Sequence, residues 1–521
     1  MNMREMVKEL EQRRERVREM GGEKRVARQK ERGKMTARER LDYLFDDGEF
    51  LEVGMHGTVM GTGEEQHVPA DGVVTALGKI RGRMTAVAAY DFTVKGGSIG
   101  RTGEVKVARM REIALVERIP IIWLVDSAGA RIDAMGASGG MSGDMISLFA
   151  ASGALFQEQV IMSGVVPQVA AMVGPGAAGT AYIPGLADFV PMVRGTSSMA
   201  LAGPPLVKAA MGEEVDEETL GGAKVHTRES GNADLMVKGD RECLDAIREY
   251  LSYFPQNCEE KPEIMPCDDP VDRGEDSLLD LIPENPKAAY DMYEVVHALV
   301  DHGRIFDLKP RWGRSIITCF ARMGGYSVGI VANNPKQLGG TLGVDSADKA
   351  AKFVNLCDSF NIPLIFLQDV PGFMVGSRVE KAGIIRHGAK MLHAVASATV
   401  PKLTVVCRKG YGAGYYVMNG RAYNPDLLFA WPGAEISVMG PEGMVGIAGR
   451  ALKGQEMPEE TKQELIAALR KNIDIYKVAG WGYVDDVISP TETRRKLIQG
   501  LELTRNKHVE RPWRKAGVRP V

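Results

Sequence analysis

Two glycine-rich segments are the part of this sequence best suited to chemistry. Residues 174–179 read GPGAAG and residues 410–414 read GYGAG, and each follows an apolar run and precedes a helical pattern. Glycine and alanine leave backbone N–H groups uncovered, and the start of a helix adds partial positive charge. Such donors stabilise an enolate or tetrahedral oxyanion, and losing one donor costs roughly 2.7–4 kcal/mol in comparable sites. Alternatively, these glycines serve only close packing of helix against strand.

Other catalytic signatures do not account for these loops. Neither segment continues into the Lys-Ser/Thr pair of a phosphate-binding P-loop, and neither matches a dinucleotide-binding GxGxxG with an acidic residue about 20 positions further on. No HExxH motif occurs, and the eight histidines lack ligand spacing. We therefore expect no metal site and a mechanism that relies on backbone donors.

Composition narrows the class of protein. The chain has 521 residues, of which 44% are hydrophobic and 26% charged, with a formal net charge of −3. These values exclude wholesale disorder and give no support to nucleic-acid binding. Six cysteines form no CxxC pair, the N-terminus lacks the apolar core of a signal peptide, and no run of about 18 apolar residues occurs. The sequence predicts a cytoplasmic protein without a transmembrane segment.

An internal repeat organises the chain. The segments GGSIG (96–100) and IPIIWLVDSAG (119–129) recur as GGTLG (339–343) and IPLIFLQDVPG (362–372), both 243 positions later. The segment that contains the first glycine loop, 165–182, is matched by 399–416 at an offset of 234. Because this offset is far longer than a solenoid repeat, it predicts two related α/β domains built from strand–helix–strand units.

The domain boundary is expected in a segment rich in proline and acidic residues. Residues 255–277 show little hydrophobic periodicity. We place the domains at 1–268 and 269–521, with a charged helix over residues 3–31 as an N-terminal extension.

Several segments in order resemble the β subunits of acyl-CoA carboxylases, the biotin-dependent carboxyltransferases. They include GKMTARERLDYLFDDGEFLEVG (33–54), DFTVKGGSIG (91–100) and DSAGARI (126–132) in the first half. The second half contributes FARMGGYSVGIVANNP (320–335) and DSADKAAKFVNLCDSFNIPLIFLQDVPGFMVG (345–376). The resemblance covers nearly the whole chain.

The resemblance implies a fold and an assembly. The fold is α/β, with two duplicated crotonase-like domains and an N-terminal helical extension, which agrees with the internal repeat. The assembly is a homohexamer in which the N-terminal domain of one protomer faces the C-terminal domain of another. Acyl-CoA is expected on the N-terminal domain and biotin on the C-terminal domain.

The resemblance also implies site residues. A first oxyanion hole falls on Ala178 and Gly179, facing the acyl thioester, and a second on Ala413 and Gly414, facing the biotin ureido oxygen. Tyr416 is expected to influence substrate choice. The residues expected to line the CoA side are Lys95, Gly96, Gly97, Ser98, Ser127, Ala128, Gly129, Ala130 and Arg131.

Biotin is expected on a separate subunit, and coenzyme A enters as part of the substrate. The expected partners are therefore a biotin carboxylase and a biotin carrier. Carboxybiotin would release CO2, and its nitrogen would take the α-proton of the acyl-CoA, so no protein general base is required. Two alternatives remain, which are the carboxyltransferase subunit of a sodium-pumping acyl-CoA decarboxylase and a non-catalytic assembly scaffold.

Two departures from the family pattern bear on the substrate. Tyr416 stands where propionyl-CoA carboxylase β subunits typically have an Asp, and this region is closer to the methylcrotonyl- and geranyl-CoA carboxylases. The first loop reads GPGAAG where the family often has GPCAGG, so Ala178 replaces a glycine. We therefore expect a preference for longer, branched or unsaturated acyl groups over propionyl-CoA.

Overall fold

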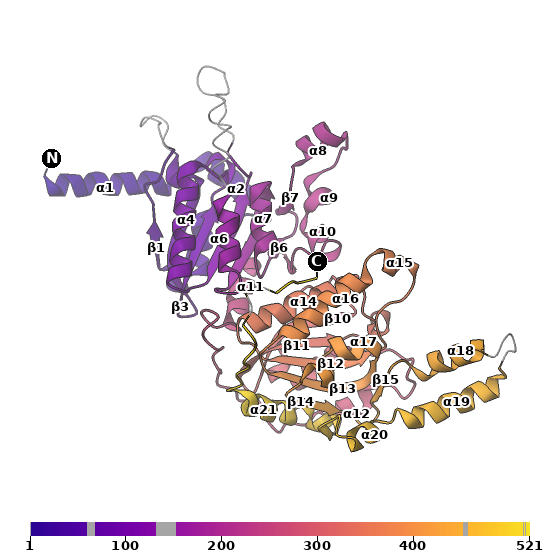
Figure 1. The fold of residues 1–521 in the computed structure, drawn as a ribbon. Helices are drawn as coiled ribbons and strands as arrows, with labels where there is room; N and C mark the ends of the chain where they lie inside the picture. The colour runs from indigo at the N-terminus through magenta and orange to yellow at the C-terminus, as the bar shows by residue number, and fades with distance from the viewer. Residues whose placement is uncertain are drawn as a thin grey trace. The chain divides into compact units, whose positions relative to one another are not determined.

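The chain folds into two compact units, Met1–Glu260 and Lys261–Val521. The computed structural model describes residues 2–59, 68–131, 153–451, 457–513, 515 and 517–520. Within these ranges each unit is built on one eight-stranded mixed sheet (Figure 1). The division falls eight residues before the boundary that we expected from the sequence.

The first sheet has the strand order β1-β2-β3-β4-β5-β6-β8, and β7 pairs with β5. Its first three strands are antiparallel and the others parallel. The strands are β1 (Phe50–Val53), β2 (Val73–Ile80), β3 (Arg83–Tyr90), β4 (Ile121–Ser127), β5 (Gln168–Ala177), β6 (Pro191–Val193), β7 (Ser198–Ala200) and β8 (Leu235–Val237).

The second sheet repeats this topology, which confirms the predicted duplication. Its order is β9-β10-β11-β12-β13-β14-β16, and β15 pairs with β13 as β7 pairs with β5. The strands are β9 (Ile305–Asp307), β10 (Ile316–Met323), β11 (Tyr326–Asn333), β12 (Leu364–Val370), β13 (Lys402–Tyr411), β14 (Leu427–Ala430), β15 (Glu435–Ser437) and β16 (Asp486–Val487).

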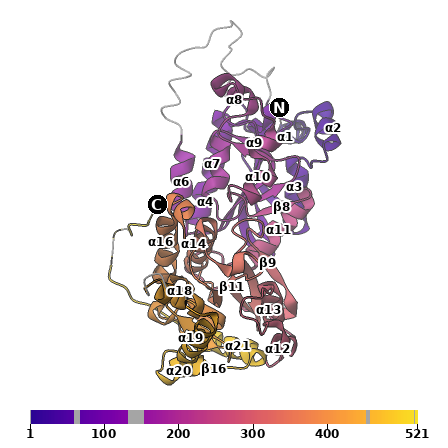
Figure 2. The same cartoon turned by 90° about the vertical axis from the view of Figure 1, so that its right-hand side faces the viewer.

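The helices that recur in both units follow equivalent strands. In the first unit they are α4 (Arg101–Val116), α6 (Ala154–Met162) and α7 (Gly179–Leu186), and in the second α14 (Val344–Ser359), α16 (Ile384–Ser397) and α17 (Gly412–Val417). In the second unit α14 and α16 lie side by side (Figures 1 and 2).

Among the remaining helices, α3 and α13 precede the first strand of their sheets, and α11 and α21 follow the last. Those of the first unit are α1 (Met3–Arg18), α2 (Glu23–Glu31), α3 (Ala37–Leu44), α8 (Pro204–Met211), α9 (Glu217–Gly221), α10 (Ala223–Arg228) and α11 (Asp240–Ser252). Those of the second are α12 (Ser277–Leu281), α13 (Met292–Leu299), α15 (Ser377–Lys381), α18 (Pro441–Ala451), α19 (Glu459–Asn472), α20 (Ile475–Gly480) and α21 (Thr493–Thr504).

The N-terminal extension is not the single helix that we expected over residues 3–31. It consists of α1 and α2, because Met20 (φ 53°) and Gly22 (φ 83°) adopt left-handed backbone conformations between them. Gly21 fits tightly there, since a Cβ atom would lie 2.0 Å from the carbonyl oxygen of Thr93. The extension therefore packs against the segment that leads to Lys95.

The central parallel strands are apolar throughout because both of their faces are covered. Every residue of β4 and β12 is buried. Fully buried parallel strands appear in a sequence as continuous apolar runs, as IIWLV and LIFL do here. Each strand has an aspartate as its next-to-last residue, Asp126 in β4 and Asp369 in β12, and these strand ends border the candidate sites.

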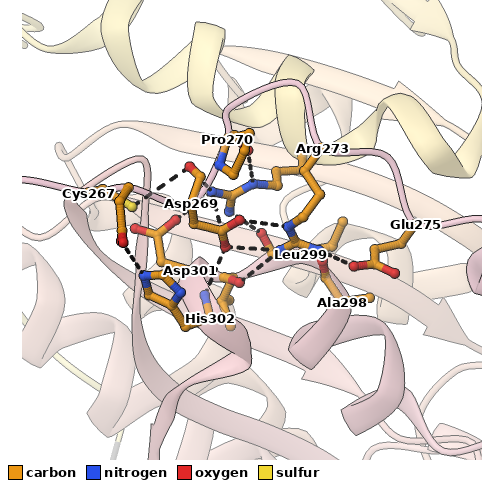
Figure 3. A network of polar contacts seen from close by, with 12 residues as sticks. Cys267, Asp269, Pro270, Arg273, Glu275, Ala298, Leu299, Asp301 and His302 are labelled. Carbon is orange, nitrogen blue, oxygen red and sulfur yellow. Dashed lines mark hydrogen bonds and ion pairs between the residues drawn. The ribbon is translucent and has the colours of Figure 1, made fainter.

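A polar network fixes the start of the second unit. The Asp269 carboxylate accepts hydrogen bonds from Arg273 Nε (2.8 Å) and from the His302 N–H (2.8 Å). Arg494, on α21, donates to Asp301 Oδ1 (2.7 Å) (Figure 3). Because charge-assisted hydrogen bonds are roughly twice as strong as neutral ones, the segment around Asp269 is firmly attached to the second unit.

Candidate functional site

The strand register aligns the two glycine loops residue by residue. Ser127 on β4 pairs with Gly176 on β5, and Val370 on β12 pairs with Gly410 on β13, each after a register shift. Gly176 and Gly410 are therefore equivalent positions. Counting forward, Ala178 corresponds to Gly412 and Gly179 to Ala413.

The second predicted pair, Ala413 and Gly414, therefore begins one residue later than the first. Gly414 corresponds to Thr180 and is buried, and a Cβ atom there would lie 2.8 Å from the Val370 side chain. Ala413 is exposed and Gly412 is half-buried. The register thus matches Gly412 and Ala413, rather than Ala413 and Gly414, to the first loop.

In the first loop the two predicted donors are the N–H groups of Ala178 and Gly179, and the Ala178 N–H is already bonded to a neighbouring strand. The N–H of Ala178 donates to the carbonyl oxygen of Ala200 on β7 (3.1 Å). Gly179 is the first residue of α7, and the first N–H groups of a helix have no acceptor within it. Ala178 is exposed and Gly179 half-buried. The Gly179 N–H is therefore the donor that an oxyanion can use.

In the second loop the equivalent donor belongs to Ala413. Gly412 has a φ of 56°, close to the 51° of Ala178, and α17 begins there. The Ala413 N–H lies in the first turn of α17, so it also lacks an intrahelical acceptor. Both loops consequently present one exposed or half-exposed helix-start N–H at the same place in the fold.

The segments predicted for the CoA side lie next to each other. The Ala128 N–H donates to the Gly96 carbonyl (2.8 Å), and the Arg131 N–H donates to the Ile99 carbonyl (3.0 Å). The Lys95 side chain is exposed beside them. The other predicted residues are distributed between surface and interior: Ala128 and Ala130 are exposed, Gly96 is half-buried, and Gly97, Ser98, Ser127 and Gly129 are buried.

Arg131, which was predicted to line the CoA side, is half-buried, and its guanidinium bonds to the protein. It forms an ion pair with Asp71, Nε donates to Ser98 Oγ (3.1 Å), and Nη2 donates to the Ser98 carbonyl (2.9 Å). Arg131 therefore connects the predicted CoA-side turn to the interior of the first unit.

Asp126, the next-to-last residue of β4, is held by residues 29–40, which run from the end of α2 into α3. Asp126 is completely buried, and its carboxylate accepts hydrogen bonds from Lys34 Nζ (2.6 Å), Arg40 Nη1 (2.9 Å) and Gln29 Nε2 (3.0 Å). Burial lowers the pKa of Lys34, opposed by the Asp126 charge. The sequence analysis missed this arrangement, because nothing in the spacing connects residues about 90 positions apart.

In the second unit the neighbouring strand β13 provides the cation that pairs with the equivalent aspartate, Asp369. Asp369 is also buried, and its carboxylate accepts from Arg408 Nε on β13 (2.8 Å). Burial raises the pKa of Asp369, opposed by the Arg408 charge. The position equivalent to Arg408 is Gly174, where a Cβ atom would lie 1.8 Å from Asp126 Oδ1. The missing side chain at Gly174 leaves the space that Lys34 enters.

The two loops have the same backbone but opposite chemical character. Lys95 and Leu338 begin equivalent short turns, and Arg131 and Met374 occupy equivalent positions after β4 and β12. In the second unit Val375 and, at 76% exposure, Ile385 are exposed, and the exposed cations Arg378, Lys381 and Arg386 lie near them in the sequence. At the two equivalent positions the first unit therefore has a lysine and an arginine, and the second a leucine and a methionine.

Tyr416 lies on α17 beside the second loop. Its side chain is 47% exposed, and its ring stacks on Tyr423 with a centroid separation of 6.4 Å and meets Tyr415 edge-on at 6.1 Å. An aromatic surface therefore adjoins the second glycine loop.

Three short segments match hydrolase patterns; one of them, 136–140, lies outside the described residues, and the other two lack the matching geometry. Ser98, in GGSIG, donates through Oγ to the Lys95 carbonyl and accepts from Arg131. Ser346, in SADK, donates to the Gly343 carbonyl, while Lys349 donates to the Ile316 carbonyl (2.8 Å). Both serines are occupied in backbone contacts, so neither is placed as a nucleophile with a base.

Histidine and acidic side chains pair in the described part of the chain without gathering into a metal site. No group of three or more His, Cys, Asp or Glu suited to a metal ion occurs among the described residues. His387 and Lys390 on α16 both contact Asp348 on α14, at 2.7 and 3.2 Å. Within the same ranges, no helix has the length and apolar character required to cross a membrane.

Comparisons with known proteins agree with this geometry. Residues 28–519 match the family model described as the carboxyl transferase domain. The chain is 42% identical to the propionyl-CoA carboxylase carboxyltransferase subunit of Haloferax mediterranei over 527 residues, covering 100% of both chains. It is 40% identical to the methylmalonyl-CoA decarboxylase subunit alpha of Propionigenium modestum, covering 99% of each.

A solved structure shows the same architecture. The hexameric transcarboxylase 12S core, with methylmalonyl-coenzyme A and methylmalonic acid bound, superimposes with a TM-score of 0.93 at 41% identity, covering 100% of both chains. This confirms the predicted fold class of two duplicated crotonase-like domains with a helical N-terminus.

The conformation of Ala178 generates a stability prediction. Its φ of 51° and ψ of −119° lie in a region that residues with a Cβ atom rarely adopt, at a cost of order 1–3 kcal/mol. Replacing Ala178 by glycine should therefore stabilise the first unit by about 1 kcal/mol after the entropic cost of a glycine in the unfolded chain. Urea unfolding of the Ala178→Gly variant measures this.

Ala177→Gly is the matched control, because Ala177 is the neighbouring residue in extended β5 backbone and should lose stability when its Cβ atom is removed. Equal destabilisation of both variants would show that Ala178 carries no backbone strain.

Proposed function

Since the chain belongs to the carboxyl transferase domain family, we propose that it is the carboxyltransferase subunit of a biotin-dependent acyl-CoA carboxylase. It would move CO2 from carboxybiotin to the α-carbon, or the vinylogous γ-carbon, of an acyl-CoA. The observation that carries this proposal is the contrast between two equivalent loops, one bordered by Lys95 and the other by Leu338.

The first loop suits an acyl-CoA. Coenzyme A carries phosphate groups, which favour the exposed ammonium of Lys95, and an acyl thioester, whose oxygen becomes negative when the α-proton leaves. The Gly179 N–H is positioned to donate to that oxygen. Of the two predicted first-hole residues, Gly179 supplies the donor and Ala178 supplies the backbone turn that exposes it.

The second loop suits biotin carried on a separate subunit. The ureido ring of biotin is uncharged, and the exposed side chains of Leu338 and Ile385 offer it an apolar surface. When bound, biotin supplies the carboxyl group and the nitrogen base of the reaction. The Ala413 N–H is positioned to donate to the ureido oxygen, and Gly412 provides the turn before it. We therefore assign the second hole to Gly412 and Ala413.

Because biotin is carried on a separate subunit, the proposed reaction requires assembly with other chains. The transcarboxylase 12S core is a hexamer, and we propose a homohexamer in which the N-terminal domain, 1–268, of one copy faces the C-terminal domain, 269–521, of another. A biotin carboxylase and a biotin carrier on other chains would complete the cytoplasmic enzyme.

A second candidate function is the decarboxylation direction in a sodium-pumping complex. The 40% identity to a methylmalonyl-CoA decarboxylase subunit favours it, because the same two holes serve both directions. The partner distinguishes the two functions. Co-purification with an ATP-dependent biotin carboxylase supports the carboxylase, whereas co-purification with an integral-membrane subunit supports the decarboxylase.

Removing the second donor should stop turnover without unfolding the protein. In Ala413→Pro the N–H is lost, and the preceding residue, Gly412, has no Cβ atom to clash with the proline ring. We expect kcat to fall by about 100-fold or more, because the oxyanion loses a donor. The assay measures incorporation of labelled bicarbonate into acyl-CoA with ATP and the biotin-bearing partner.

Ala413→Gly is its control, since it keeps the N–H and should retain most activity. Wild-type turnover by a folded Ala413→Pro preparation would refute the assignment of the donor. Failure of the wild-type protein to fix label with any acyl-CoA would refute the proposed function itself.

Substrate choice is expected to depend on Tyr416. An exposed aromatic ring packs well against an apolar acyl chain, whereas a carboxylate at that position favours solvent. We propose lower kcat/KM with propionyl-CoA than with a longer, branched or unsaturated acyl-CoA, and a shift toward short chains in Tyr416→Asp. Apolar pockets discriminate by about 1–3 kcal/mol per methylene, so the preference should be graded.

A panel of acyl-CoAs assayed with wild type and Tyr416→Asp provides the measurement. An unchanged ratio of kcat/KM values across the panel would mean that Tyr416 only packs at an interface.

A further inference from the structure

The turn that directly precedes β2 has two consecutive left-handed non-glycine residues in the first unit, whereas the equivalent turn of the second unit has a glycine at the first of these positions. Ala70 (φ 52°) and Asp71 (φ 50°) are consecutive non-glycine residues in the left-handed region. The position equivalent to Ala70 is Gly313 (φ 54°), which adopts this conformation without a Cβ atom, and the position equivalent to Asp71 is the exposed Arg314. Strained backbone persists only where surrounding contacts hold it, and it concentrates at functional sites.

A buried lysine holds the strained turn. Lys106 Nζ, on α4, donates to the Ala70 carbonyl (2.8 Å) and to the Val73 carbonyl (2.6 Å), so the turn is fixed on both sides of Asp71. Lys349 is the equivalent residue of α14, and it donates to the Ile316 carbonyl at the equivalent of Val73. The lysine anchor is therefore common to both units, and in the second unit it also donates to the carbonyl of Lys309 (2.9 Å), which has a φ of 54°. The aspartate and the pair of consecutive left-handed residues are found in the first unit.

The Asp71 carboxylate connects this anchor to the candidate acyl-CoA loop. Asp71 is completely buried, Oδ2 accepts from the Gly103 N–H at the start of α4 (2.7 Å), and Oδ1 pairs with Arg131 Nη1. Arg131 in turn donates to Ser98 Oγ and to the Ser98 carbonyl. One carboxylate thus connects α4, the turn that begins at Lys95, and the loop that follows β4.

We propose that Asp71 is a positioning residue of the first site, which acts through Arg131 to hold the Lys95 turn and residues 128–131 in the geometry that binds acyl-CoA. This inference rests on the proposed function. Loss of the Asp71 charge leaves the guanidinium of Arg131 buried without its carboxylate, so the side chain must move toward water and release Ser98. The second site has Met374 in place of Arg131 and does not depend on such a pair.

The test is a double-mutant cycle read out by binding. Titration calorimetry with an acyl-CoA should give a Kd at least ten-fold weaker for Asp71→Asn and for Arg131→Met than for wild type. The double variant should bind no more weakly than the weaker single variant, because both residues act as one unit. The KM for the biotin-bearing partner should stay unchanged in all three. Arg314→Asn, at the equivalent exposed position, is the control and should bind acyl-CoA as wild type does.

Each outcome bears on the inference. Wild-type acyl-CoA affinity in folded Asp71→Asn, or losses that simply multiply in the double variant, would overturn it. If Asp71→Asn alone fails to fold, Arg131→Met carries the test, and wild-type affinity in that variant would equally overturn the inference. A wild-type protein that binds no acyl-CoA would contradict the proposed function rather than the role of Asp71.

Discussion

Two buried carboxylates, Asp126 and Asp369, constrain the rest of this structure. Each is the next-to-last residue of the central parallel strand of its sheet, where water is excluded from both faces. Burying a carboxylate costs several kcal/mol unless cations and hydrogen bonds compensate. The ends of β4 and β12, which border the candidate ligand sites, therefore stay in place only while these pairs persist.

The two units compensate their carboxylates differently, and the difference explains the N-terminal extension. Arg408 reaches Asp369 from the adjacent strand, whereas Lys34 and Arg40 reach Asp126 from a segment that precedes the first sheet. Gly174 leaves room for Lys34, and Gln29 of α2 also donates to Asp126, so the segment that precedes the first sheet is a structural part of the first unit. The two repeats therefore share the buried carboxylate but differ in the cations that pair with it, which are Lys34 and Arg40 in the first unit and Arg408 in the second.

The duplicated fold and the two glycine loops could be predicted from the sequence, because repeated motifs and apolar runs are local signals. The repeated segments, GGSIG with GGTLG and 165–182 with 399–416, can be recognised in the sequence without a structure. The two sheets confirm the duplication that these segments indicate. The two approaches place the second donor pair differently. Motif resemblance predicts Ala413 and Gly414, whereas the strand register matches Gly412 and Ala413 to the first loop.

Contacts between distant segments could not be predicted. The pairs Lys34–Asp126 and Asp71–Arg131 join residues that no periodicity links, and each depends on a backbone approach that only the fold provides. The break between α1 and α2 was missed for the same reason, since it follows from the close contact of Gly21 with Thr93. Charged patterning indicated helix there, but tertiary packing decided where that helix ends.

The central claim is that two equivalent loops bind chemically different ligands, an acyl-CoA at the first and biotin at the second. An experimental structure of the assembled protein with a non-hydrolysable acyl-CoA and biotin bound tests it most directly. The account predicts the thioester oxygen within hydrogen-bonding distance of the Gly179 N–H and the ureido oxygen within that distance of the Ala413 N–H. Acyl-CoA bound at the Leu338 loop, or biotin at the Lys95 loop, would contradict it.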